Sequence, residues 1–197
     1  MKKKLLTATL VATLSTSAVA VDVQYFVGGE FGSAKMSMDA SVLGIDLGEA
    51  SDRGGFAGLK FGAILNENHR IGVSYNSYNT ESNIDLNSYG IGYDYLIKTS
   101  TKLTPFVGVG LAKVNYKETG YKTIDNDFDS DTFEMDGLIG TVNLGAVFEI
   151  TNNFELEAGY RMALIKNVDG IIGYSGVPVE AELGDSNMTY FGINYKF

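Results

Sequence analysis

The sequence of 197 residues contains no cysteine, no tryptophan, one histidine and two prolines. Without cysteine, disulfides, zinc–thiolate sites and thiol catalysis are excluded. The single histidine, His69, leaves no room for a histidine-cluster metal site and removes most histidine-based catalysis. With 15 basic and 24 acidic residues, the net charge of −9 argues against DNA or RNA as a partner. We therefore expect no cofactor, no metal centre and no nucleic acid partner.

Glycine and aromatic residues, in contrast, are abundant. The chain has 24 glycines, well above the usual ~7% of residues, together with 12 tyrosines and 11 phenylalanines. With only two prolines and no collagen period, the glycines do not indicate a triple helix. The contents of hydrophobic residues (45%) and charged residues (20%) are ordinary for a folded protein.

Residues 1–20 have the features of a signal peptide. Three lysines follow Met1, residues 5–14 are mostly apolar, and Ala18-Val19-Ala20 matches the small-x-small pattern of a signal peptidase site. The apolar stretch is shorter than the ~20 residues of a membrane-spanning helix. We expect cleavage after Ala20, export of the protein, and one domain over residues 21–197.

The rest of the chain is dominated by alternation of apolar and polar or glycine residues with a period of two. In residues 87–96, for example, Tyr89, Ile91 and Tyr93 alternate with Gly90 and Gly92. Each segment of this kind is about ten residues long, the length that a tilted strand needs to cross a bilayer. The eight segments are residues 23–33, 56–65, 70–79, 87–96, 103–116, 137–150, 154–163 and 188–197.

The connections between these segments alternate between short and long. Residues 66–69, 98–102 and 151–153 form short polar turns, whereas residues 34–52, 80–84, 117–136 and 164–185 form the longer loops. Short turns at one end and longer loops at the other predict an up-and-down antiparallel barrel. The loop from residue 164 contains further apolar residues, so it can extend the seventh and eighth strands as a hairpin.

Alternation alone fits either a soluble barrel with a ligand inside or a membrane barrel with lipid outside. The positions that alternate with the apolar residues are rich in glycine and carry few long charged side chains. This composition suits a narrow lumen better than a water-exposed surface. Aromatic residues also gather near one end of the segments, as in an interfacial girdle: Tyr25, Tyr95, Phe148, Phe154, Tyr195 and Phe197. We therefore predict an all-β fold, an eight-stranded antiparallel up-and-down transmembrane β-barrel.

The C-terminus and two internal segments carry a family resemblance. Residues 190–197 end in Phe197, with Tyr195 two residues before it and Gly192 five before it. This segment resembles the terminal strand by which bacterial outer-membrane proteins are recognised for assembly. Residues 105–110 and 155–161 resemble the fifth and seventh strands of the small outer-membrane barrels. The mature chain thus resembles the eight-stranded outer-membrane barrels of Gram-negative bacteria, which include the OmpA transmembrane domain and the OmpX/Ail type.

The resemblance implies a location in the bacterial outer membrane, with lipid, lipopolysaccharide and the assembly machinery as partners. Some small barrels of this kind are enzymes, and the resemblance implies that each uses a histidine near the outer rim. If the N-terminus is periplasmic, as in the family, His69 lies at the opposite end and has no obvious serine partner. We therefore expect no enzymatic activity.

The alternating carboxylates of one loop form a weak candidate for calcium binding. Asp125, Asp127, Asp129 and Asp131 have the spacing of the first EF-hand ligands. The glycine and glutamate that an EF-hand needs at its sixth and twelfth positions are missing. A solvated acidic loop is the better interpretation.

A second candidate for a functional site is a set of charged residues at the strand positions that alternate with the apolar ones: Glu30, Lys60, Arg70, Glu157 and Arg161. Inside a filled eight-stranded barrel these side chains can form buried ion pairs that plug the lumen, or they can simply be hydrated. Two functions follow from this interpretation. The first is a structural or narrow-porin role in the membrane. The alternative is adhesion or host binding through the extracellular loops.

Overall fold

Eight long strands account for most of the chain. The computed structural model describes residues 21–43, 45–79, 84–119, 132–174 and 177–197. No helix in this part of the chain is long and apolar enough to span a membrane. The strands are β1 (Val23–Val42), β2 (Ile45–Leu65), β3 (His69–Asn79), β4 (Ile84–Leu96), β5 (Leu103–Thr119), β6 (Thr132–Glu149), β7 (Phe154–Tyr174) and β8 (Val177–Lys196).

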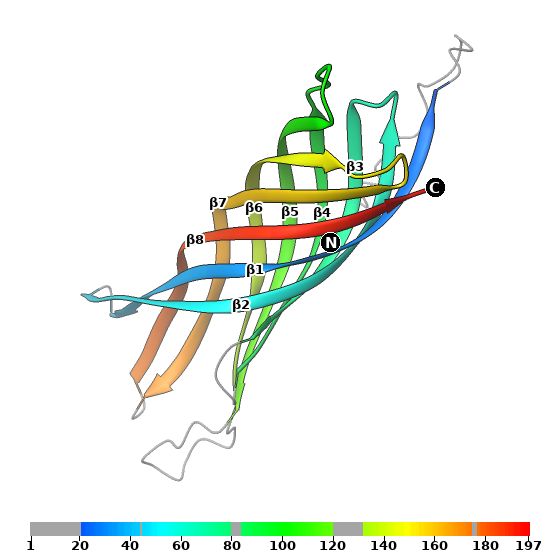
Figure 1. Ribbon diagram of the computed structural model, residues 1–197. Coiled ribbons are helices and arrows are strands. Elements are labelled where there is room, and N and C mark those ends of the chain that lie inside the picture. The colour runs from blue at the N-terminus through cyan, green and yellow to red at the C-terminus, as the bar shows by residue number, and fades with distance from the viewer. Residues whose placement is uncertain (1–20, 44, 80–83, 120–131, 175–176) are drawn as a thin grey trace, which may run out of the picture.

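Each strand pairs with the next in antiparallel fashion, and β1 pairs with β8 to close the barrel (Figure 1). The closing hydrogen bonds join Tyr25 and Phe197, whose backbone N and O atoms bond in both directions at 3.2 and 2.9 Å. Closure leaves no free sheet edge, which a barrel in lipid requires. The predicted eight-stranded antiparallel barrel is confirmed.

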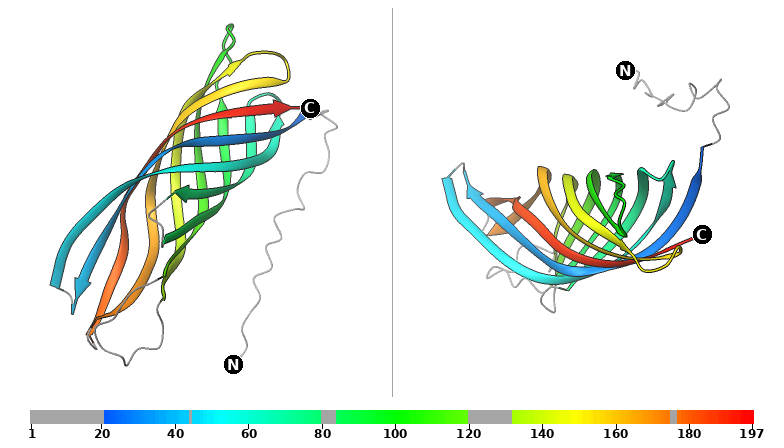
Figure 2. Two further views of the ribbon diagram at one scale, coloured as in Figure 1. Left: turned by 60° about the horizontal axis from the view of Figure 1, so that its bottom comes forward. Right: turned by 45° about the horizontal axis from the view of Figure 1, so that its top comes forward.

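The turn between β2 and β3 shows why one end of the barrel is compact. Asn66 and Glu67 adopt positive φ angles of 48° and 61°, which reverse the chain directly after β2. Asn66 N also donates a hydrogen bond of 2.8 Å to the carbonyl of Asp22, which ties this turn to the start of β1. The start of β1 and the C-terminus lie side by side at this same pole, called the turn end below (Figure 2).

The prediction of long loops is wrong for two segments, because strands occupy most of both segments. Residues 34–52 continue β1 and β2 as a paired hairpin that reaches Val42 and Ile45. Residues 164–185 likewise continue β7 and β8 as far as Tyr174 and Val177, which confirms the hairpin extension. Apolar and polar residues do not alternate clearly in these outer segments, because their buried face carries polar side chains such as Ser37 and Ser186 as well as apolar ones such as Leu183.

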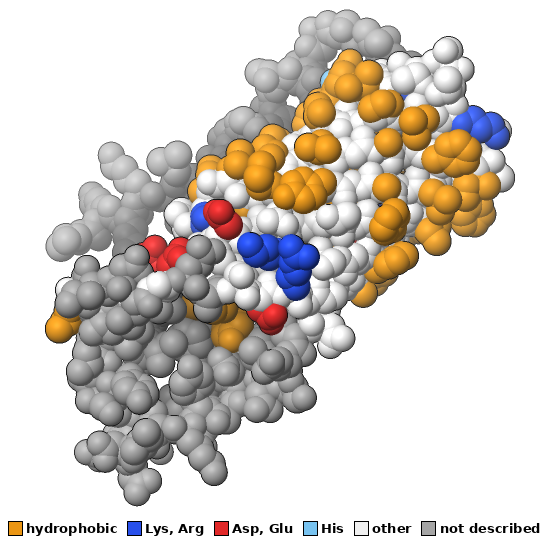
Figure 3. All heavy atoms as spheres, turned by 60° about the vertical axis from the view of Figure 1, so that its left-hand side comes forward, with side chains coloured by type: hydrophobic (Ala, Val, Ile, Leu, Met, Phe, Trp, Pro, Cys, Tyr) orange, Lys and Arg blue, Asp and Glu red, His pale blue; other side chains and the backbone are white. Residues whose placement is uncertain are grey.

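The apolar residues of the alternating pattern face outward. Leu59, Ile91 and Val109 are each more than half exposed, and hydrophobic side chains spread over the outer face of the barrel (Figure 3). Charged side chains gather at one border of this surface. An exposed apolar wall bordered by charge matches a bilayer and not water.

The expected aromatic girdle lies around the turn end. The rings of Tyr25 and Phe197 are 6.2 Å apart, and those of Phe154 and Tyr195 are 5.0 Å apart. Further toward the loops, the ring of Tyr75 lies 5.0 Å from that of Tyr89 on the same outer wall. Aromatic side chains therefore occur toward both borders of the apolar wall, as at two membrane–water interfaces.

Candidate functional site

The lumen is crossed by buried charges that meet at Glu157 on β7. Lys60 Nζ and Arg70 Nη1 each lie 2.7 Å from Glu157 Oε2. Tyr190 donates a hydrogen bond of 3.2 Å to the other carboxylate oxygen, and Asn194 donates one of 2.9 Å to Oε2. One carboxylate thus binds cations from β2 and β3 across the lumen and polar groups from the neighbouring strand β8.

A second carboxylate, Glu30 on β1, completes the layer. Arg161 Nη1 lies 3.1 Å from Glu30 Oε1, and Lys60 Nζ lies 4.0 Å from Oε2. Arg161 Nε also donates a hydrogen bond of 3.2 Å to Asn143, whose amide donates to Asp94 at 3.4 Å. Asp94 accepts from Arg70 at 2.9 Å, which returns the network to Glu157.

The layer is balanced in charge and packed between aromatic rings. The cations Lys60, Arg70 and Arg161 face an equal number of carboxylates: Glu30, Asp94 and Glu157. The Arg70 guanidinium lies 4.7 Å from the centre of the Phe106 ring, and that of Arg161 lies 5.0 Å from the Tyr190 ring. Such stacking stabilises a guanidinium that has lost its water.

Strand geometry and glycine explain why these side chains fit in so narrow a lumen. All of the charged residues occupy inward-facing strand positions, so their side chains point into the same lumen. Glu30 pairs with Gly58 on one neighbouring strand and with Gly192 on the other. Glycine beside a long charged residue leaves the space that a Cβ would otherwise occupy. The high glycine content of the sequence therefore serves to hold bulky side chains inside the barrel.

The structure brings together all five of the lumen charges named from the sequence, Glu30, Lys60, Arg70, Glu157 and Arg161. It adds members that the sequence analysis did not name for this network: Asp94, Asn143, Tyr190 and Asn194. The signal for Asp94 was available, because it is the direct cross-strand partner of Arg70. The same signal was available for Asn143, the direct cross-strand partner of Arg161, and Tyr190 and Asn194 lie beside Glu157 on the neighbouring strand β8.

Apolar side chains fill the lumen on both sides of this charged layer. Toward the turn end lie Phe26, Ile64, Leu96, Phe106 and Val147. Toward the loops lie Ala34, Phe56, Tyr78, Leu86, Val114, Ile139 and Met188. Cavities of only about 60 and 50 Å³ remain in and beside the charged layer. The wider hollow of about 310 Å³ is the polar mouth at the turn end.

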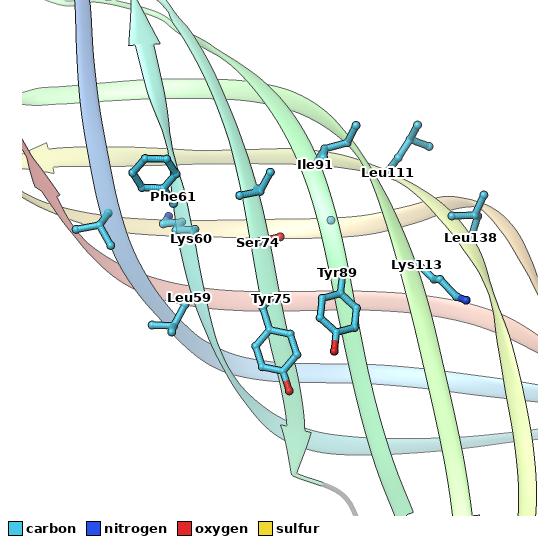
Figure 4. Close-up of a pocket in the computed structure, with 13 residues that line it drawn as sticks. Leu59, Lys60, Phe61, Ser74, Tyr75, Tyr89, Ile91, Leu111, Lys113 and Leu138 are labelled. Carbon is cyan, nitrogen blue, oxygen red and sulfur yellow. The ribbon is translucent and has the colours of Figure 1, made fainter. Parts of the chain in front are cut away.

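A wider hollow lies on the outer wall and not in the lumen. It has a volume of about 850 Å³ and extends from Val27 of β1 to Leu138 of β6. Leu59, Tyr75, Tyr89 and Leu111 project along it, with Lys113 at its border (Figure 4). Its side chains belong mostly to the outward apolar parity, so its lining matches the hydrocarbon chains that surround a membrane barrel.

The remaining candidates from the sequence lie outside the lumen layer. Gly192 is in β8 beside Glu30 and Glu157, whereas Tyr195 and Phe197 are in the aromatic girdle at the turn end. His69 starts β3 at the same end, where its Nδ1 lies 2.8 Å from the Tyr93 hydroxyl. The calcium candidates Asp125, Asp127, Asp129 and Asp131 lie outside the described residues. Within the described ranges, no cluster of three or more His, Asp or Glu side chains could hold a metal ion.

Comparison with known proteins agrees with this architecture. Residues 5–197 match the family model of the outer membrane protein beta-barrel domain. The chain belongs to this family. The family places the protein in the outer membrane of a bacterium. No curated protein sequence is significantly similar to the chain.

Solved outer-membrane barrels share the fold at low sequence identity. Neisserial surface protein A is 23% identical with a TM-score of 0.57, over 88% of this chain and 97% of that one. The outer membrane protein OprG of Pseudomonas aeruginosa is 14% identical with a TM-score of 0.60, over 88% and 95%. The N-terminal barrel of OprF from the same organism is 17% identical with a TM-score of 0.52, over 84% and 98%. At these identities the likeness concerns the fold alone.

Proposed function

We propose that this barrel is a non-enzymatic structural protein of the bacterial outer membrane, with a lumen closed to axial passage. The observation that carries the proposal is the ion-pair layer centred on Glu157, which joins β1, β2, β3 and β7 across the interior. Apolar side chains on both sides of the charges, with small polar ones such as Ser88 and Thr141 among them, narrow the lumen and oppose the continuous water column that ions need. Buried pairs inside the barrel also fix the strands relative to each other, because separating one pair leaves an unpaired charge in the interior.

Single-channel recording tests the closed lumen. The protein is refolded in detergent, purified in the folded form by its heat-dependent gel mobility, and inserted into a planar bilayer. We expect no reproducible openings of the wild-type barrel. Openings that change in Arg161→Ala but not in Lys117→Ala would replace this proposal with a narrow pore. Lys117 is the matched control because its ion pair with Glu134, at 2.9 Å, lies on the outer face.

The structural role is tested in cells that lack the protein. We expect such cells to become more sensitive to detergent and to large antibiotics, and a plasmid copy of the wild-type chain to restore resistance. Because the role needs a folded barrel and no conduction, the Arg161→Ala variant should complement whenever it reaches the membrane. Unchanged sensitivity in the deletion strain would contradict the proposal.

A second function, binding of an extracellular ligand through the loops, is favoured by the outer hairpins. β1 and β2 stay paired out to Val42 and Ile45, and β5 and β6 carry exposed ion pairs such as Lys113–Asp136 at 2.8 Å. Paired strands hold a surface in one shape and so lower the entropy cost of binding. Replacing residues 37–51 by a short turn should abolish cell adhesion, if adhesion is the function, and leave detergent resistance intact.

A further inference from the structure

Two cations lie opposite each other on the outer face of the barrel, toward the loops. Lys35 of β1 and Arg53 of β2 are direct cross-strand partners, and Lys35 also pairs in register with the neutral Asn187 of β8. Both cations occupy outward-facing positions of their strands, like the exposed Phe31 and Leu59. Like charges directly opposite each other destabilise a sheet. These two residues, called the basic pair below, are therefore stabilised by an anion that lies between them.

The described part of the chain does not supply that anion. The other described cations toward the loops each have a carboxylate oxygen within 3.0 Å: Lys113, Lys117 and Lys166. Among the described side chains, no carboxylate forms such an ion pair with Lys35 or Arg53. Asp52 is next to Arg53 in the sequence, but its carboxylate accepts a hydrogen bond of 2.6 Å from the Arg53 backbone N. In a chain with a net charge of −9, two adjacent cations of this kind are an exception.

The basic pair lies at the loop-side border of the apolar wall. Tyr25, in the aromatic girdle of the turn end, precedes Lys35 by ten residues on the same outward face of β1. With a rise of ~3.3 Å per residue and a tilt of ~40°, this stretch spans about 25 Å along the barrel axis, the height of the apolar band of a membrane barrel. Basic side chains also gather beside the hydrophobic surface in Figure 3. The basic pair therefore lies at the level of the lipid head groups.

Large apolar side chains lie below the basic pair on the same face. Phe31 and Phe191 are cross-strand partners, each more than half exposed, and their rings are 6.3 Å apart. They lie four residues closer to the turn end than the level of the basic pair. Between the two levels Ser33 pairs with Thr189, so small hydroxyl side chains separate the rings from the cations. This order matches a lipid whose acyl chains lie below an anionic head group.

We propose that the basic pair binds a phosphate group of lipopolysaccharide, the phosphorylated lipid of the outer leaflet. The Arg53 guanidinium offers a fork of N–H donors that matches phosphate oxygens, and Lys35 adds a point charge. A phosphate between the two cations also removes their mutual repulsion, which a neutral lipid cannot do. The acyl chains of the same molecule then lie along the exposed rings of Phe31 and Phe191. The site is on the outer wall, so it does not depend on whether the lumen conducts.

Native mass spectrometry of the refolded barrel tests the site with lipid A, the phosphorylated anchor of lipopolysaccharide, in a neutral detergent. Replacing both cations, by Lys35→Gln with Arg53→Gln, should raise the Kd for lipid A about tenfold to thirtyfold. The matched control is Lys113→Gln with Lys117→Gln. It changes the net charge equally but removes cations that already face carboxylates. Its Kd should stay within about twofold of the wild-type value.

Dephosphorylated lipid A separates the phosphate contact from the apolar contact. The wild-type barrel should bind it as weakly as the variant without the basic pair binds lipid A. Equally tight binding of both lipids to the wild type would show that the acyl chains alone are recognised, and would overturn the proposal. Phosphatidylglycerol that binds as tightly as lipid A would also overturn it, because any anionic head group would then suffice.

An unchanged Kd after loss of the basic pair, or an equal rise of the Kd in the control, would overturn the proposal directly. In detergent without lipid, the variant without the basic pair should unfold at no lower urea concentration than the wild type, because it loses a repulsion. Should that double variant fail to fold by gel mobility, Arg53→Gln alone, at an exposed position, serves as the second variant. An unchanged Kd for lipid A in Arg53→Gln would overturn the proposal equally.

Discussion

Arg70 and Glu157 form a two-pronged ion pair in the centre of the lumen, although 87 positions separate them in the sequence. The Nη1–Oε2 distance is 2.7 Å, the Nη2–Oε1 distance is 3.3 Å, and the two side chains are 6% and 1% exposed. Planar guanidinium and carboxylate groups match in this geometry, which fixes the distance between β3 and β7. The pair is therefore the most direct link across the barrel.

Neutralising Glu157 should strongly destabilise the barrel. Glu157→Gln keeps the shape of the side chain but leaves Lys60 and Arg70 buried with one carboxylate too few. Removing one partner of a buried ion pair typically costs ~3–5 kcal/mol. We expect a clearly lower urea midpoint for unfolding from detergent micelles.

The matched control for that experiment is Glu134→Gln. It is the same chemical change in the exposed pair with Lys117, where water solvates both partners. Its midpoint should stay close to that of the wild type. Similar losses of stability in the two variants would show that the buried ion pair contributes no more to the free energy of unfolding than the exposed pair does.

Glycine at position 159 should be needed for space. A Cβ there would lie 2.5 Å from the Tyr190 ring, which is buried and hydrogen-bonded to Glu157. Gly159→Ala should therefore displace the ring and lower the unfolding midpoint. Gly92→Ala is the control, since a Cβ on that lumen glycine meets only the Val109 carbonyl at 3.8 Å. If Gly92→Ala were the more harmful of the two, crowding would not explain the lumen glycines.

The final aromatic residue should matter for assembly more than for stability. The Phe197 ring is exposed on the outer wall, 6.2 Å from those of Tyr25 and Tyr195. We expect Phe197→Ala to lower the amount of folded barrel in the outer membrane of growing cells, while refolding in detergent stays nearly normal. Phe154→Ala removes another ring of the same girdle, 5.0 Å from Tyr195, without changing the C-terminus. Equal losses in cells would assign the effect to the girdle and not to an assembly signal.

Much of this architecture is readable in the sequence because a strand has a strict period of two. Alternation separated the lipid-facing Leu59 and Ile91 from the lumen-facing Lys60 and Gly90 without any knowledge of pairing. The prediction that residues 34–52 form a loop was wrong, and for residues 164–185 the hairpin extension was right, because the buried face of these segments carries polar residues such as Ser37 and Ser186 and the alternation that marks a strand is weak there. Residues 1–20 remain a predicted signal peptide, since they lie outside the described residues.

The strand faces, the outward apolar wall and the membership of the charges in one interior follow from the order of residues along the chain. Which charges meet depends on the closed barrel, because Glu157 binds Lys60 and Arg70 from strands that closure and strand stagger bring opposite it. The interruption of the ladder between β7 and β8, which lies between the pairs Met162–Asn187 and Asp169–Glu182, is also a tertiary property. It results from bulges whose positions depend on the pairing of three strand ladders, and no local pattern in a single strand records such a mismatch.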